Sequence, residues 1–203
     1  MSYVRRGPWT CGFLVVLLVA HVWFTVSPAA DTAIAWLSTN LDNLARHPVG
    51  SLLGSALVTD GSLVDPGLLI TLWLGIGLAL WWIEAHRGAR RAATVFLAGH
   101  VGATLLTAVV LLVAIRAGTY PDDARSAVDV GVSYGAEAAL AAATVALPRW
   151  ARAPWVLFVL GWPIADADWY GLLPDFTTVG HLIAAAIGFA LAATLLRTPR
   201  STS

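Results

Sequence analysis

Four ionisable side chains and one serine lie in apolar stretches of this sequence, where polar groups usually serve a function. The ionisable residues are His21, His100, Glu137 and His181, and the serine is Ser133. A serine hydroxyl is a weak nucleophile until a base within hydrogen-bonding distance accepts its proton. Ser133 and His181 could form such a pair if their helices pack together, and the pair would support acyl transfer. The alternative is a serine that packs between helices and a histidine that is hydrogen-bonded in the core.

Small residues around these two side chains favour close packing of the helices that carry them. They flank Ser133 on both sides and follow His181 at helical spacing, and the set comprises Gly131, Gly135, Ala184, Ala185 and Gly188. Residues without bulky side chains let two helix backbones approach closely. We therefore expect Ser133 and His181 to lie at a similar depth.

The composition is that of an integral membrane protein. Hydrophobic residues make up 58% of the 203 residues, charged residues make up 12%, and the formal net charge is +0. A soluble domain has about 25% charged residues, and a neutral chain without a basic patch excludes most nucleic-acid binders. The single cysteine, Cys11, excludes an internal disulfide framework. Because a bilayer offers the backbone no hydrogen bonds, we expect an all-α polytopic fold in one domain, residues 1–203.

Six apolar stretches approach the length of about 20 residues that a membrane-spanning helix needs. We expect spans at residues 9–26, 66–83, 92–115, 130–147, 153–170 and 177–196. The fifth span is the weakest, because Asp166 and Pro163 interrupt it. Residues 126–129 form a capping-box pattern, which would place Ser133 about two turns inside the fourth helix. The first stretch has an alternative interpretation as a secretory signal, since residues 27–30 resemble a cleavage site.

The long loop at residues 29–65 contains an apolar stripe that predicts an amphipathic helix at the membrane interface. The stripe comprises Ile34, Leu37, Leu41 and Leu44. Asp31 and Thr32 are candidate N-caps for this helix. Residues 49–58 predict a second helix.

The distribution of arginine predicts which loops face the cytoplasm. With both termini inside, the inner segments carry Arg5, Arg6, Arg87, Arg90, Arg91, Arg149, Arg152, Arg197 and Arg200. The outer segments carry only Arg46, Arg116 and Arg125, and the positive-inside rule favours this orientation. The absence of lysine and the abundance of alanine suggest a GC-rich genome, and we expect a bacterial plasma membrane.

These features together resemble the rhomboid intramembrane serine proteases over about residues 10–196. The resemblance rests on six spans, the long first outer loop, Gly131-x-Ser133, His181 followed by small residues, and Glu84 followed by Gly88. It implies that Ser133 is the nucleophile and His181 the base, without a cofactor. It also implies partners in the lipid bilayer, either single-span substrates cleaved near the outer face or helices that are only bound.

Several positions depart from the family pattern. Tyr134 replaces the second glycine of the G-x-S-G motif, and Glu137 replaces an aromatic residue that packs on the histidine. Leu68 and Leu72 occupy positions near those where the family carries oxyanion donors. Loss of one such donor costs about 2.7–4 kcal/mol of barrier. A catalytically inactive relative that binds membrane helices is therefore the alternative hypothesis.

The remaining polar residues allow several roles. His100 could replace an oxyanion donor or bond a neighbouring helix, and Glu137 could orient His181, pair with His100 or be hydrogen-bonded in the core. His21 is expected at the interface. No helical metal-ligand spacing joins the acidic residues near His181, so we expect no metal site. A small transporter is the least favoured class, because no repeat is visible.

Overall fold

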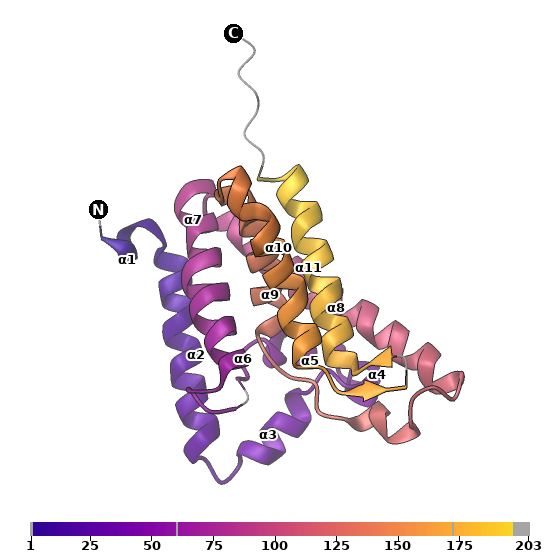
Figure 1. The fold of residues 1–203 in the computed structure, drawn as a ribbon. Coiled ribbons are helices and arrows are strands. Elements are labelled where there is room, and N and C mark those ends of the chain that lie inside the picture. Colours follow the sequence, from indigo (N-terminus) through magenta and orange to yellow (C-terminus); the bar gives the residue numbers. More distant parts are fainter. Residues whose placement is uncertain (1, 60, 172, 197–203) are drawn as a thin grey trace.

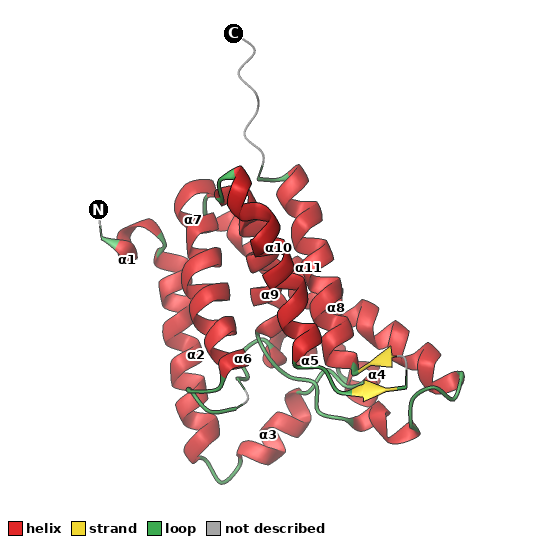
Figure 2. Ribbon diagram, viewed as in Figure 1, coloured by secondary structure: helices red, strands yellow, loops and turns green. Residues whose placement is uncertain are grey.

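The computed structural model describes residues 2–59, 61–171 and 173–196 as an elongated bundle of helices (Figures 1 and 2). Within the described residues, four helices are long and apolar enough to cross a membrane, and the chain is an integral membrane protein. They are α2 (Pro8–Val26), the continuous Pro66–Arg87 helix, α8 (Ala89–Arg116) and α11 (Phe176–Thr194). The Pro66–Arg87 helix consists of α6 (Pro66–Leu69), the π-helix η1 (Ile70–Leu80) and α7 (Trp81–Arg87). The short α1 (Tyr3–Arg6) precedes α2.

Two shorter helices occupy the places of the fourth and fifth predicted spans. The fourth is α9 (Ser133–Ala142), continued by the 3₁₀-helix η3 (Ala143–Ala146), and the fifth is α10 (Arg149–Ala165). Every residue of α9 after Ser133 is buried, because its alanine-rich surface is covered by η1, α8, α10 and α11. The structure thus shows four spans by length, with a central buried helix and α10 packed among them.

The predicted start of the fourth helix is wrong. Residues 126–129 do not form a capping box, because Ser126 ends the 3₁₀-helix η2 (Asp122–Ser126) and residues 127–132 form a loop. Ser133 is consequently the first residue of α9 rather than a residue two turns inside it. This loop is held by hydrogen bonds to residues 38, 39 and 55, which replace the expected helical bonds.

The fold is mostly helical, but the predicted end of the fifth span at residue 170 is wrong. The fifth helix ends at Ala165 and does not continue to residue 170. A small antiparallel hairpin follows, formed by β1 (Trp169–Tyr170) and β2 (Leu173–Pro174). The side chain of Asp175 then accepts a hydrogen bond from the backbone of Thr178 and starts α11.

The first long loop forms three short helices, because the predicted amphipathic helix is divided into two while the second predicted helix, at residues 49–58, is found as one. They are α3 (Ala30–Leu37), α4 (Leu41–Arg46) and α5 (Pro48–Ser55). The stripe breaks because the Ser38 hydroxyl accepts a bond from the Asp129 N–H (2.9 Å) and the Thr39 N–H donates to the Asp129 carbonyl (2.7 Å). The N-cap position of α3 is Ala29, so the prediction of Asp31 or Thr32 as the cap is wrong.

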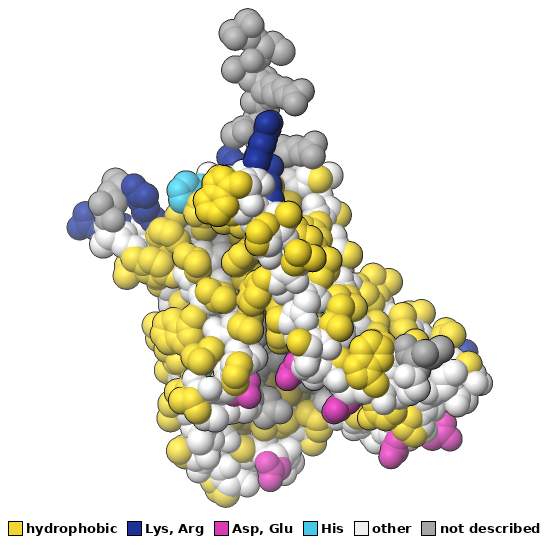
Figure 3. Space-filling model, viewed as in Figure 1, with side chains coloured by type: hydrophobic (Ala, Val, Ile, Leu, Met, Phe, Trp, Pro, Cys, Tyr) yellow, Lys and Arg dark blue, Asp and Glu magenta, His cyan; other side chains and the backbone are white. Residues whose placement is uncertain are grey.

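Opposite ends of the bundle carry opposite charges. Figure 3 shows dark blue arginines at the end where α1 begins and α11 ends, and magenta acids at the other end. The acidic residues define the acidic end of the bundle, and they include Asp65, Asp129, Asp166 and Asp175. Arg197 and Arg200, which were counted on the inner side, lie outside the described residues.

The buried carboxylate of Glu84 links two helices at the arginine-rich end of the bundle. It accepts hydrogen bonds from the N–H groups of Trp9 (3.0 Å) and Thr10 (2.7 Å), which have no acceptor within α2. Gly88 then turns the chain into α8 with φ 90°, a conformation that favours glycine. Glu84 and Gly88 thus connect α2, α7 and α8.

Candidate active site

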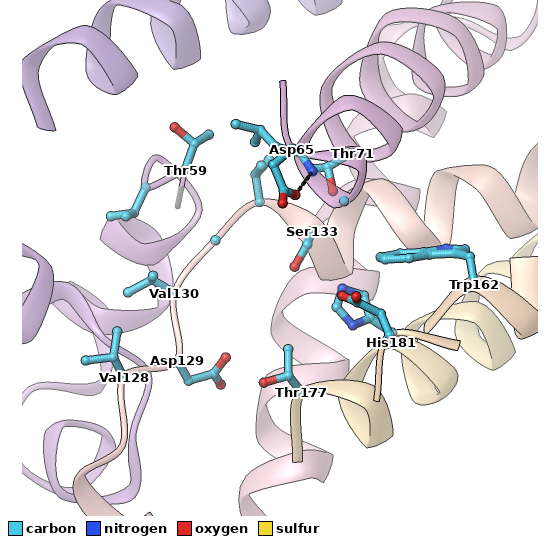
Figure 4. A pocket seen from close by; sticks show the side chains of 16 residues that line it. Thr59, Asp65, Thr71, Val128, Asp129, Val130, Ser133, Trp162, Thr177 and His181 are labelled. Atoms are coloured by element: carbon cyan, nitrogen blue, oxygen red, sulfur yellow. Dashed lines mark hydrogen bonds between the residues drawn. The ribbon is translucent and has the colours of Figure 1, made fainter. Parts of the chain in front are cut away.

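A pocket of about 320 Å³ lies at the acidic end of the bundle (Figure 4). Ser133 of α9 and His181 of α11 both line it, although they lie 48 positions apart in the sequence. Its remaining walls come from residues 58–59, 65, 67–68, 71, 128–132, Trp162, Asp166 and Thr177. The expected approach of the two helices is therefore found, and it places both side chains at one cavity.

Gly131 determines how the chain enters α9 at Ser133. Its φ is 125°, where a residue with a side chain would be strained. The Gly131 N–H donates to the Ser55 carbonyl at 3.0 Å, which fixes the turn against the end of α5. Helix α9 has no side-chain N-cap. The first N–H groups of a helix lack intrahelical acceptors, so the backbone at Ser133 can donate to a ligand.

His181 is 7% exposed and lies in the second turn of α11. Its Nε2 is buried and has no hydrogen-bond partner among the described residues. The ring hydrogen-bonds the backbone of Thr177 one turn earlier. Since Nε2 has no partner, this bond engages Nδ1 and leaves Nε2 available. No hydrogen bond joins the Ser133 hydroxyl to His181 within the described part of the chain.

Two aromatic rings hold the imidazole of His181. Tyr134 contacts it edge-on, with ring centroids 5.1 Å apart, and Trp162 contacts it at the same centroid distance. Gly180 makes room for the tyrosine, because a Cβ at this position would lie 2.2 Å from Tyr134 Cζ. Tyr134 thus replaces the second glycine of the sequence motif with a ring that positions the histidine.

Glu137 reaches the site through Trp162. Its Oε2 accepts a hydrogen bond from Trp162 Nε1 at 2.9 Å, and its Oε1 has no partner among the described residues. The predicted pairings of Glu137 with His181 or His100 are not found. The alternative, in which Glu137 is hydrogen-bonded in the core, is the one observed. Trp162 is a residue that the sequence analysis missed, because its contact with Glu137 depends on how α10 packs.

A comparison with models of protein families identifies the family of this chain. The family model described as "rhomboid-like protein" matches residues 2–202. The chain belongs to the rhomboid-like protein family. No curated protein and no solved structure matches it.

Two helix contacts explain the small residues of this rhomboid-like protein. A Cβ at Gly188 would lie 2.2 Å from the Ala138 carbonyl oxygen, so α11 packs directly on the backbone of α9. A Cβ at Gly135 would lie 2.4 Å from the ring of Phe96 in α8. The expected packing role of both glycines is confirmed.

His100 and His21 do not line the pocket. His100 Nε2 hydrogen-bonds the Leu52 carbonyl (2.8 Å) and the Ser55 hydroxyl (3.2 Å), which confirms the interpretation as a bond to a neighbouring helix. His21 is buried inside the protein, where its Nδ1 hydrogen-bonds Thr59 at 2.8 Å, and it does not lie on the outer surface of α2.

The oxyanion positions of this rhomboid-like protein are apolar, but a hydroxyl lies between them. Leu68 lines the pocket, and Leu72 is buried beside it without lining it. Thr71 also lines the pocket (Figure 4), and it is the polar residue that counting back along the sequence missed by one position. The described His, Cys, Asp and Glu residues form no group of three that could hold a metal ion.

Proposed function

We propose that this rhomboid-like protein is an intramembrane serine protease that cleaves single-span membrane proteins. The observation that carries the proposal is the common pocket of Ser133 and His181, in which His181 Nε2 is buried without a partner among the described residues. A buried nitrogen without a partner costs about 1–3 kcal/mol. A serine hydroxyl that rotates toward it on substrate binding would recover part of this free energy, and catalytic hydrogen bonds often shorten only in such complexes.

The reaction would follow the general scheme of acyl transfer. Ser133 Oγ attacks the peptide carbonyl while its proton moves to His181 Nε2. The C–N bond then breaks and the proton passes from the imidazolium to the leaving amine. A water molecule, deprotonated by the same nitrogen, hydrolyses the acyl-enzyme and restores the serine. The bond to Thr177 keeps the proton of the neutral ring on Nδ1.

The oxyanion would be stabilised by donors other than the leucines. The Ser133 N–H at the start of α9 is one, since helix N-termini favour negative charge. The Thr71 hydroxyl, which also lines the pocket, is the second. One such donor typically lowers the barrier by about 2.7–4 kcal/mol.

Cleavage would take place near the outer face of a bacterial plasma membrane. The arginine-rich end, including both termini, would then face the cytoplasm, and the acidic end with the pocket would face outward. The positive-inside rule supports this orientation.

The test is proteolysis in liposomes that contain the protein and a panel of single-span peptides. We expect cleavage of at least one peptide, with a loss of about 10³-fold or more in Ser133→Ala and His181→Ala. The matched controls are Ser126→Ala and His86→Ala, which change exposed residues outside the pocket and should cleave normally. Cleavage that continues at the wild-type rate in Ser133→Ala would refute the proposal.

A second candidate function is the binding of membrane helices without catalysis. Leu68 in the oxyanion region and the missing hydrogen bond between Ser133 and His181 in the described structure favour it. In this case Ser133→Ala would retain partner binding and any cellular phenotype. A phenotype that disappears with this hydroxyl would exclude the second function.

A further inference from the structure

Three carboxylates from different parts of the fold line the pocket. Asp65 precedes α6, Asp129 lies in the loop before α9, and Asp166 follows the last residue of α10. No arginine is among the described residues that line the same pocket. The pocket wall therefore carries a concentration of negative charge that its own residues do not balance.

The existing partners of these carboxylates are neutral. Asp65 Oδ1 accepts from the Leu68 N–H, whereas Asp129 accepts from the hydroxyls of Thr39 and Tyr134. The ion pair found among the described residues joins Arg125 to Asp42 and involves none of the three. No hydrogen bond to the Asp166 side chain is found in the described structure.

Asp166 is also placed unfavourably for its own helix. It is the C-cap of α10, where the helix dipole disfavours an anion. It is exposed at the pocket, so its charge is directed at whatever enters. Carboxylates at the wall of a cleft with apolar surroundings concentrate their field within the cleft and attract cations.

The histidine is independent evidence that the pocket receives a ligand. The His181 side chain lines the same cavity (Figure 4), and its Nε2 is buried and lacks a partner among the described residues. A single metal ion does not explain the charge, since the described carboxylates and histidines form no group that could hold one. An extended cation, such as an arginine or lysine side chain, could contact carboxylates on separate walls.

We propose that the pocket selects membrane-protein segments that carry a basic side chain beside the part that enters the pocket. Asp166, together with Asp65 and Asp129, recognises this side chain. This inference rests on the proposed function, because the proposed function supplies a membrane-protein segment as the ligand. It adds the substrate class, which is a span flanked by arginine or lysine at the acidic end.

The test measures binding separately from catalysis. The protein is the full chain with Ser133→Ala, in nanodiscs of neutral lipid. The probes are two synthetic Leu/Ala single-span peptides that differ at one residue just beyond the span, which is arginine in one and its uncharged analogue citrulline in the other. We expect the arginine peptide to bind about fivefold more tightly at low salt, and high salt should remove the difference.

The additional substitutions identify the residues responsible. Asp166→Asn should abolish most of the preference for arginine, whereas Asp168→Asn, an exposed neighbour that does not line the pocket, should preserve it. Equal binding of both peptides, or a preference unchanged in Asp166→Asn combined with Asp65→Asn, would overturn the inference. If the preference is found and the wild-type protein cleaves no peptide of the liposome panel, the proposed protease function fails while the charge recognition stands.

Discussion

At the residue scale, the arrangement around His181 differs from a triad with a carboxylate orienting the base. The ring is held by Tyr134 and Trp162 and by the backbone of Thr177. Glu137 acts on the tryptophan and does not contact the histidine. We therefore regard Glu137 as a positioning residue.

Substitution of Glu137 tests this role. Glu137→Gln retains an oxygen for Trp162 Nε1 and should cleave normally, whereas Glu137→Leu removes the acceptor and should lower kcat by about 10- to 100-fold. The tryptophan emission spectrum, to which all ten tryptophans contribute, should shift in Glu137→Leu alone. The proposed role would be contradicted if both variants lost activity equally, since that would mean that the charge itself is required.

The sequence predicts only part of the site. Small residues beside Ser133 and His181 were sufficient to predict that their helices meet, since backbone contact requires them. Trp162 and Thr71 could not be predicted, because their places depend on the position of α10 and on the rotation of the Pro66–Arg87 helix.

At the element scale, the loop before α9 is connected to the first long loop through Asp129. The backbone and the carboxylate of Asp129 hydrogen-bond Ser38 and Thr39, which join α3 to α4. The sequence pattern at residues 126–129 fits a helix cap as well as it fits the observed loop contacts. Local chemistry alone could not distinguish these two structures. The positions of the helices followed from apolar length, whereas these boundaries depended on contacts distant in sequence.

The titration of Asp129 provides a test of this connection. Burial raises the pKa of its carboxyl from 3.8 to about 6, and the hydrogen bonds from Thr39 and Tyr134 offset only part of that effect. Between these values the folded protein binds more protons than the unfolded chain, so this group's contribution to stability falls as the pH rises from about 4 to 6. Asp129→Asn should therefore have a higher Tm than the wild type at pH 7.

The comparison is made as a pH series of thermal unfolding in detergent. The difference in Tm between Asp129→Asn and the wild type should decrease on acidification and disappear only well below pH 3.8, where the wild-type carboxyl is protonated in both states. A difference that increases toward low pH would mean that the ionised carboxylate stabilises the fold.

At the scale of the whole molecule, composition alone was sufficient to identify a membrane protein, because so few charges cannot form a water-exposed surface. Four spans meet the length requirement, while the buried α9 is surrounded by other helices and does not need to reach both faces. The pocket lies at the acidic end, where this central helix begins.

The central claim is that Ser133 is activated by His181, and labelling by a fluorophosphonate probe tests it without knowledge of a substrate. Intact-mass measurement of the purified, folded protein should show one probe per chain in the wild type. Ser133→Ala should show none, and His181→Ala should react at least about 100-fold more slowly. A folded wild-type protein that stays unlabelled, or a Ser133→Ala variant that is labelled as fast as the wild type, would contradict the claim.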